Sequence, residues 1–375
     1  MRKFFAFIVL AGLTLAFSQA PVRAENSPPP SSTATPMRDE ECLSCHNQPD
    51  MRVTLPSGEM FSLSVDGKRY RASIHGEKGY ACTQCHTNIT GFPHQAQEAR
   101  SRREISVQMA QTCGECHTQA QAQYDQGFHA MRQRSGRLEA AVCSDCHGAH
   151  DIQPVENGES IPRICQRCHS EIYAAYAQSV HGKALLEENN TDVPTCETCH
   201  AYHNNAGPSK EGYHLYSPQL CATCHADPKL MEKYGIRTDV FETYVADFHG
   251  TTVTIFEQIA PGQETNKPAC IDCHGVHSIL SPTDENSPVL KQNLLRTCQR
   301  CHPGATPEFS EAWLSHYQPD WQTAPLVTAV NWFYRLLIPV TVGGMVLFVS
   351  TDFWRHKIVP RLRRGDKEEA RHEDA

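Results

Sequence analysis

All 18 cysteines of this 375-residue chain lie in one five-residue motif, Cys-x-x-Cys-His, which occurs nine times. In chain order, motifs 1 to 9 occupy residues 42–46, 82–86, 113–117, 143–147, 165–169, 196–200, 221–225, 270–274 and 298–302. This spacing is the covalent attachment sequence of c-type haem: two thiols bond to one porphyrin, and the adjacent histidine binds its iron. We therefore expect nine c-type haems, with electron transfer at iron as the chemistry.

The expected attachment residues are the two cysteines of each motif. They are Cys42, Cys45, Cys82, Cys85, Cys113, Cys116, Cys143, Cys146, Cys165, Cys168, Cys196, Cys199, Cys221, Cys224, Cys270, Cys273, Cys298 and Cys301. The histidine that ends each motif is the expected proximal iron ligand. These ligands are His46, His86, His117, His147, His169, His200, His225, His274 and His302.

Two other uses of paired cysteines fit this pattern less well. Zinc sites need sets of four ligands and do not demand a histidine directly after every second cysteine. A disulfide framework places no requirement on histidine at all. The haem interpretation accounts for every cysteine and for every histidine that follows one.

The motifs are arranged in a repeat that contains two of them. Clear copies run over residues 113–150, 165–203 and 221–277, each with one histidine between its two motifs and another three residues after the second motif. A looser copy comes first, with Ser73-Ile74-His75-Gly76 between motifs 1 and 2. Motif 9, followed by His316, forms half a copy at the end.

The repeat supplies one further histidine for each motif, and a histidine after one motif often serves a neighbouring haem. We expect these to be distal iron ligands: His75, His94, His129, His150, His181, His203, His249, His277 and His316. His214 is then spare, although the sequence leaves the choice between His203 and His214 open. Two imidazoles give a lower reduction potential than a methionine ligand does, and low potentials suit anaerobic respiration.

The N-terminus has the pattern of a secretory signal. Arg2 and Lys3 precede an apolar run over residues 4–17, and Val22-Arg23-Ala24 fits a cleavage site. Residues 1–24 are therefore predicted to be a signal peptide, with an uncleaved anchor as the alternative. Residues 25–37 are rich in Pro and Ser and predict a disordered leader. Export agrees with the haem motifs, because thioether attachment takes place outside the cytoplasm.

A second apolar stretch, at residues 326–354, predicts a transmembrane helix. Trp332 and Trp354 are separated by about 33 Å of helix, which matches a bilayer with its interfaces. Arg and Lys residues follow, so residues 355–375 are the expected cytoplasmic tail. The haem domain, residues 38–320, would lie in the periplasm at the inner membrane of a bacterium. The alternative is a buried helix, which Pro339 and Gly343-Gly344 disfavour.

The haem domain has only about 31 residues for each motif, too few to surround each porphyrin separately. We predict a mostly irregular fold with short α-helices after many motifs and little β structure, built as a wire of two-haem repeats. One β-hairpin is expected within residues 51–71, with turns at Pro56-Ser57-Gly58 and Asp66-Gly67. Aromatic residues near the motifs, among them Tyr176 and Phe248, are expected to pack on haem faces. The net charge is −8, and the haem propionates would add to the acidity. We expect no nucleic-acid partner.

The pattern S-x-H-G followed by C-x-x-C-H-G-x-H resembles the bacterial multihaem c-type cytochrome family over residues 40–320. The C-terminal HYQPDW and the single Trp-flanked span resemble the periplasmic multihaem subunit of b/c-type cytochrome quinol-oxidising complexes. In those complexes a dihaem b-type membrane protein oxidises quinol and passes electrons to the multihaem subunit. Because this chain has one predicted span, the resemblance implies a separate b-type cytochrome or other quinol-oxidising membrane subunit. The C-terminal anchor departs from the small tetrahaem quinol dehydrogenases, whose anchor is N-terminal.

The resemblance implies a membrane-anchored electron carrier between a quinol-oxidising membrane partner and periplasmic acceptors such as other cytochromes. The alternative is a multihaem reductase or oxidase with one open-coordinate haem, acting on a small nitrogen or sulfur oxyanion. Some such enzymes carry Lys in place of a motif histidine, whereas all nine motifs here end in His. We therefore prefer electron transfer to substrate conversion and assign no catalytic residue.

Overall fold

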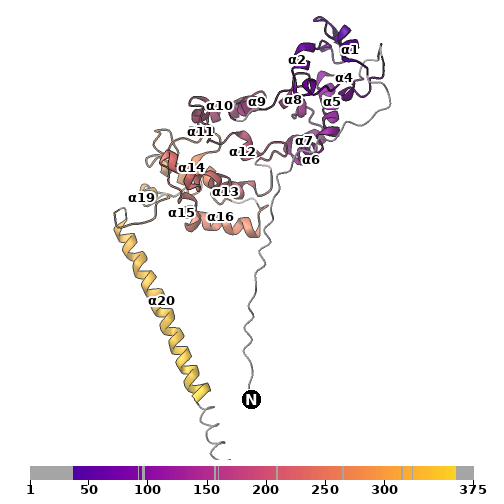
Figure 1. Ribbon diagram of the computed structural model, residues 1–375. Helices are drawn as coiled ribbons and strands as arrows, with labels where there is room; N and C mark the ends of the chain where they lie inside the picture. The colour runs from indigo at the N-terminus through magenta and orange to yellow at the C-terminus, as the bar shows by residue number, and fades with distance from the viewer. Residues whose placement is uncertain are drawn as a thin grey trace, which may run out of the picture. The chain divides into compact units, whose positions relative to one another are not determined.

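The computed structural model describes residues 37–359, apart from residues 92, 95–97, 156–157, 159, 208–209, 264–265, 314–315 and 323. The predicted signal peptide, nearly all of the leader and most of the predicted tail lie outside the described residues. The described chain consists of short helices joined by irregular segments, together with one two-stranded sheet (Figure 1). The predicted fold class is confirmed.

The chain divides into two compact units. The first comprises Met1–Asp125 and His129–Pro154 and contains motifs 1 to 4. The second comprises Gln126–Phe128 and Val155–Ala375 and contains motifs 5 to 9.

The helices from the N-terminus to motif 4 are short, apart from α5. They are α1 (Asp39–His46), α2 (Gly67–Arg71), α3 (Ile74–Glu77), α4 (Cys82–Cys85), α5 (Arg102–Cys116), α6 (Thr118–Gln126), α7 (Phe128–Arg134) and α8 (Cys143–His147).

The predicted hairpin is present, but it is shorter than expected. Strands β1 (Arg52–Thr54) and β2 (Met60–Ser62) pair antiparallel, with Val53 opposite Phe61. The second expected turn is wrong, because Asp66 is the N-cap of α2 and its side chain accepts the N–H groups of Lys68 and Arg69. An Asp followed by Gly can begin a helix as readily as a turn, since its carboxylate satisfies free N–H groups in either setting.

The helices from motif 5 to α19 are also short, and α13 and α16 are the longest of them. They are α9 (Ser160–Gln166), α10 (Ser170–Gln178), α11 (Val180–Leu186), α12 (Cys196–His200), α13 (Tyr213–His225), α14 (Pro228–Met231), η1 (Glu232–Tyr234), α15 (Val240–Ala246), α16 (Phe248–Ile259), α17 (Cys270–His274), α18 (Leu294–Gln299) and α19 (Pro307–Glu311).

Short helices follow motifs 3, 5, 7 and 9, as expected: they are α6, α10, α14 and α19. Several motifs are also helical themselves. Motifs 1, 3 and 7 end the longer helices α1, α5 and α13. Motifs 2, 4, 6 and 8 each form a separate single turn, α4, α8, α12 and α17. The two motifs of each repeat therefore differ in how the chain supports them.

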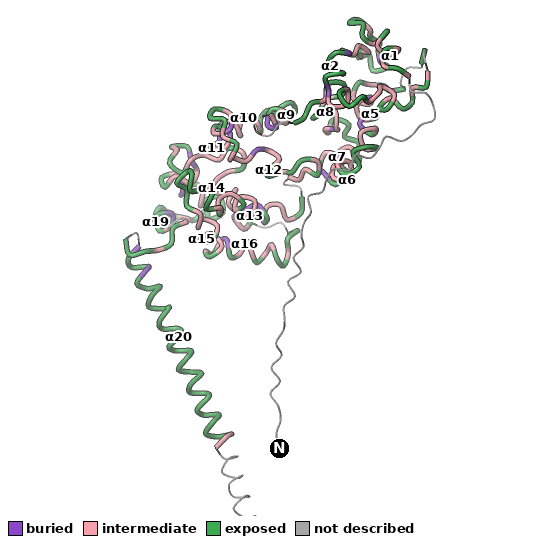
Figure 2. The backbone as a smooth tube through the Cα atoms, viewed as in Figure 1, coloured by how far each residue is buried: buried purple, intermediate pink, exposed green. Residues whose placement is uncertain are grey.

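The polypeptide has a small hydrophobic core of its own. Fifteen hydrophobic residues of the described chain are buried, and five of these are alanines. The one cluster that they form in the described ranges comprises Leu55, Ala99 and Ile105, packed by residues that include Val53 and Phe61 of the hairpin. Buried positions are scattered as short segments among the helices (Figure 2). The helices are thus fixed at many separate points.

Helix α20 (Pro325–Phe353) differs from all other described helices in length and exposure. It continues through a π-helical turn, Trp354–Ile358, and the whole segment is long and apolar enough to cross a membrane. None of its most apolar window is buried against the rest of the chain, and the helix is exposed along nearly its whole length (Figure 2). Its bounds agree with the predicted span to within one residue at each end.

Candidate haem-binding sites

Each motif uses one helical turn to direct three side chains towards one ligand. Residues i, i+3 and i+4 share one face of a helix, so the two thiols and the imidazole lie side by side. The turn is closed by the backbone: His86, His117 and His169 each donate their N–H to the carbonyl of the first cysteine in the motif at 2.9 Å. All 18 cysteines are free thiols and at least partly exposed.

The described motifs do not assemble metal-ion sites of the zinc type. Within the described ranges, no group of three or more His, Cys, Asp or Glu side chains is placed to hold a metal ion. A structural zinc site needs four such ligands together.

Seven motif histidines face a second histidine at ring-centroid distances of 6.0 to 6.3 Å. The pairs are His46–His94, His86–His150, His117–His75, His200–His277, His225–His181, His274–His316 and His302–His249. A metal–imidazole bond is about 2 Å long, so two imidazoles on opposite sides of one metal have centroids about 6 Å apart. The spacing of these pairs fits an iron held between two histidines.

Most of the pairs follow two rules. A histidine between the two motifs of a repeat faces the first motif of the next repeat, as His181 faces His225, and these planes are tilted by 44° to 58°. A histidine after motif 4 or motif 8 faces the even motif of the preceding repeat, as His277 faces His200. His316, which follows motif 9, likewise faces the even motif before it, at His274. His94 lies outside both rules, because it faces His46 of its own repeat. The planes of these pairs, those of His46 and His94 included, are closer to parallel, at 16° to 30°.

The other four predicted ligands keep their places in the repeat. His129 lies on α7 and His203 follows α12, and both are half-buried. His147 ends α8, and His169 is the N-cap of α10.

His214 has a different environment. It lies on α13, and its Nε2 is 2.7 Å from Oδ2 of Asp272, a residue inside motif 8. Asp272 also accepts the backbone N–H of Ala269 at 2.7 Å and so closes the turn of α17. This contact gives His214 a role in holding motif 8.

Backbone carbonyls orient two of the motif imidazoles. Nδ1 of His46 is 2.7 Å from the Leu63 carbonyl, and Nδ1 of His200 is 2.6 Å from the Ala206 carbonyl. A carbonyl can only accept, so Nδ1 carries the proton and Nε2 is left for the metal. Sequence reasoning missed these supports, because any residue can supply a carbonyl.

Burial keeps several of the paired imidazoles neutral. It lowers the pKa of His181 to about 4, and burial next to His316 lowers the pKa of His274 to about 4. Burial also lowers the pKa of His86 and of His150. Neutral imidazole is the form that binds a metal.

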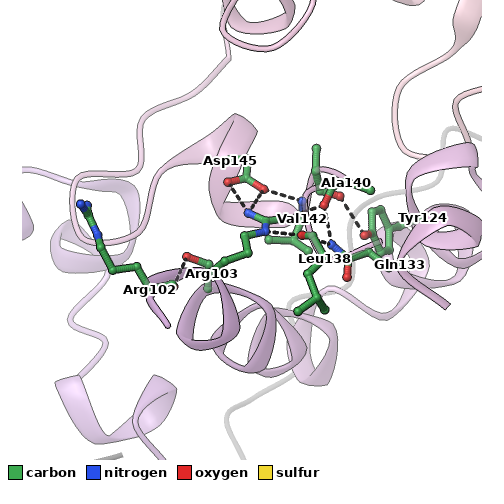
Figure 3. Close-up of polar contacts among 10 residues, drawn as sticks. Arg102, Arg103, Tyr124, Gln133, Leu138, Ala140, Val142 and Asp145 are labelled. Atoms are coloured by element: carbon green, nitrogen blue, oxygen red, sulfur yellow. Dashed lines mark hydrogen bonds and ion pairs between the residues drawn. The ribbon is translucent and has the colours of Figure 1, made fainter. Parts of the chain in front are cut away.

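Motif 4 is tied to α5 through a charged side chain (Figure 3). Asp145 accepts the N–H of Val142 at 2.7 Å, which closes α8, and it binds Nη1 of Arg103 at 2.7 and 2.9 Å. Arg103 also donates to the carbonyls of Leu138 and Ala140 in the segment before the motif. Sequence reasoning missed Arg103, since a single arginine forms no pattern.

Contacts between cysteines give the order of the attachment sites. The first cysteines of paired motifs touch: Cys42 with Cys82, Cys113 with Cys143, Cys165 with Cys196, and Cys221 with Cys270. The second cysteine of an even motif lies within electrostatic range of the motif that follows it: Cys85 of Cys116, Cys199 of Cys221, and Cys273 of Cys298. Within each unit, the sites therefore follow one another in chain order.

Paired thiols beside a histidine, facing imidazoles and sites arranged in series define a multihaem c-type cytochrome. Residues 68–148 match the family model described as cytochrome c7 and related cytochrome c. That stretch contains motifs 2, 3 and 4 together with His75 and His129. The class expected from the sequence is confirmed, and its cofactor is c-type haem.

Proposed function

We propose that this protein is a membrane-anchored electron carrier with nine c-type haems. It transfers electrons between a quinol-oxidising membrane partner and periplasmic acceptors, such as other cytochromes, in anaerobic respiration. The observation that carries the proposal is the set of seven facing histidine pairs, because two axial imidazoles leave an iron without a position for a substrate. When bound, haem supplies one-electron exchange between ferrous and ferric iron.

The repeat extends this ligand set to all nine motifs. The 18 cysteines hold the porphyrins and the nine motif histidines are the proximal ligands. The seven histidines that face them are distal ligands, and His129 and His203 complete the set by their positions in the repeat. His214 is not a ligand in this proposal, and its contact with Asp272 supports that choice.

The order of the attachment sites supports conduction along the chain. Motif 9 is the last site of the second unit. Motif 9 ends at His302 and α20 begins at Pro325, so little chain separates this site from the proposed anchor. Electrons from the membrane partner would enter at motif 9 and pass to the earlier motifs of that unit.

Helix α20 supports the anchoring part of the proposal. Its length and apolar surface suit a bilayer, and the Arg355 and Lys357 side chains follow it. With a cytoplasmic tail on that side, and export directed by residues 1–24, the haem domain lies in the periplasm.

Carbon monoxide binding separates a carrier from an enzyme with an open haem. The reduced protein, purified in detergent, is expected to keep its visible spectrum under carbon monoxide, because every iron has two histidine ligands. It is also expected to remain reduced when nitrite, hydroxylamine, sulfite or tetrathionate is added. A carbon monoxide shift equivalent to one haem, together with oxidation by one of these compounds, would replace the proposal with the reductase.

A further inference from the structure

Four tyrosines recur at one position in the repeat. Each stands five residues before a histidine of the between-motif type: Tyr70 before His75, Tyr124 before His129, Tyr176 before His181 and Tyr244 before His249. The tyrosines lie on α2, α6, α10 and α15, and the histidines lie on the next helices, α3, α7, α11 and α16.

The four hydroxyls make the same hydrogen bond. Each donates to the backbone carbonyl two residues before the first cysteine of the second motif in its repeat. Tyr124 donates to Ala141 at 2.9 Å, Tyr176 to Pro194 at 2.8 Å and Tyr244 to Pro268 at 2.9 Å, and Tyr70 donates to Tyr80. Each tyrosine therefore connects its helix to the start of motif 2, 4, 6 or 8.

The backbone of three of these tyrosines holds the helix that carries the histidine. In the repeat of motifs 5 and 6, the Tyr176 carbonyl accepts the N–H of Ser179 at 2.9 Å. Ser179 in turn caps α11 by accepting the N–H of Gly182 at 3.0 Å. A Cβ on Gly182 would approach the Tyr176 carbonyl more closely than real Cβ atoms do. The tyrosine is thus fixed to the residues on both sides of His181.

The same backbone arrangement recurs around Tyr70 and Tyr244. Ser73 and Asp247 cap their helices through the N–H groups of Gly76 and Gly250, which pack on the two tyrosine carbonyls. Beside Tyr124 these positions are Gly127 and Ala130, so the side-chain cap and the glycine are both replaced. The hydroxyl bond is the part that all four copies keep.

The four hydroxyls are available as donors at neutral pH. Burial raises the pKa of Tyr70 and of Tyr124 to about 12, and it raises the pKa of Tyr176 and of Tyr244 as well. Each phenol therefore remains protonated and can donate to its carbonyl.

We propose that these four hydroxyls, the tyrosine clamps, are positioning groups for electron transfer between successive haems. Each clamp fixes the second attachment motif of a repeat relative to the histidine that serves another site. Tyr244, for example, joins motif 8 to the helix of His249, which faces His302 of motif 9. The inference rests on the proposed function, because it requires His249 and its equivalents to be iron ligands.

The test compares Tyr244→Phe with Tyr216→Phe, a matched control whose side chain is 47% exposed. Each full-length variant is analysed for haem content, low-temperature EPR and potentiometric titration. Tyr244→Phe is expected to keep the wild-type haem content, to alter one low-spin EPR signal and to shift the midpoint potential of at least one haem. Tyr216→Phe is expected to match the wild type in all three.

If Tyr244→Phe has wild-type potentials and EPR signals, the proposed positioning role of the tyrosine clamps is wrong. This holds even if the variant unfolds at a lower temperature, because the hydroxyl would then contribute to stability alone. If Tyr244→Phe fails to incorporate haem, Tyr176→Phe tests the same bond in another repeat with the same criteria. Failure of the proposed function can be distinguished from failure of the clamp proposal. If the proposed function is wrong, the wild-type protein itself lacks the low-spin EPR signals of irons with two imidazole ligands.

Discussion

The centroids of the His274 and His316 imidazole rings are 6.2 Å apart, and the angle between the two ring planes is only 17°. The next pair in the series, His302 and His249, has nearly the same separation, 6.3 Å, but its planes are tilted by 44°. The described pairs therefore form two classes of facing imidazoles: the planes are tilted at motifs 3, 7 and 9 and closer to parallel at motifs 1, 2, 6 and 8. Plane angle changes the electronic structure of low-spin iron, so the two classes are expected to differ in their EPR signals.

Replacing His203 or His214 by Ala tests the ligand choice that the sequence left open. His203→Ala is expected to leave one iron without its sixth ligand, which produces a high-spin EPR signal of about one haem per chain. His214→Ala removes only the contact with Asp272, so every haem should remain low-spin. The reverse result would make His214 the ligand.

Gly182→Ala and Gly304→Ala form a second matched pair. A Cβ on Gly182 would meet the backbone of Tyr176, whereas a Cβ on Gly304 would meet nothing within 4 Å. We expect Gly182→Ala to lower the free energy of unfolding by about 1 to 3 kcal/mol, as overpacking does. Gly304→Ala should change it by less than about 0.5 kcal/mol. Thermal unfolding followed by circular dichroism measures both, and equal effects would contradict the close packing at Gly182.

Arg103→Met tests the support of motif 4. The change removes the ion pair with Asp145 and two donors to backbone carbonyls (Figure 3). Both side chains are partly exposed, at 26% and 33%, so we expect a loss of only about 1 to 2 kcal/mol in the free energy of unfolding. Arg102→Met is the control, because the exposed Arg102 side chain points away from this cluster (Figure 3). Similar unfolding temperatures for the two variants would contradict the assignment.

Deleting residues 332–375 tests the anchor. The deletion keeps Ala324 and Thr328, which are buried, and removes the exposed apolar part of α20. The shortened protein is expected to leave the membrane fraction and to keep the wild-type haem count, since none of the most apolar window of α20 is buried against the haem domain. Retention in the membrane would show that another segment anchors the chain. Loss of haem would show that the helix is part of the folded domain.

The candidate attachment motifs are visible in the sequence because covalent bonding to one porphyrin imposes a fixed local spacing. Most of the facing pairs could not be predicted, because the partners lie in different repeats: His150 faces His86, with motif 3 and motif 4 between them. The packing of the Tyr176 ring on a haem face stays a prediction, and the hydrogen bond from its hydroxyl to the Pro194 carbonyl could not be predicted. Every residue has a backbone carbonyl, so the residue type at position 194 does not indicate this hydrogen bond.

A haem count by pyridine haemochrome, combined with low-temperature EPR of the oxidised protein, decides whether every iron has two histidine ligands. We expect nine haems per chain, all low-spin, with signals of two classes that correspond to near-parallel and tilted imidazoles. A lower count, or a high-spin signal of about one haem per chain, would contradict histidine ligation at every iron and a purely electron-carrying role.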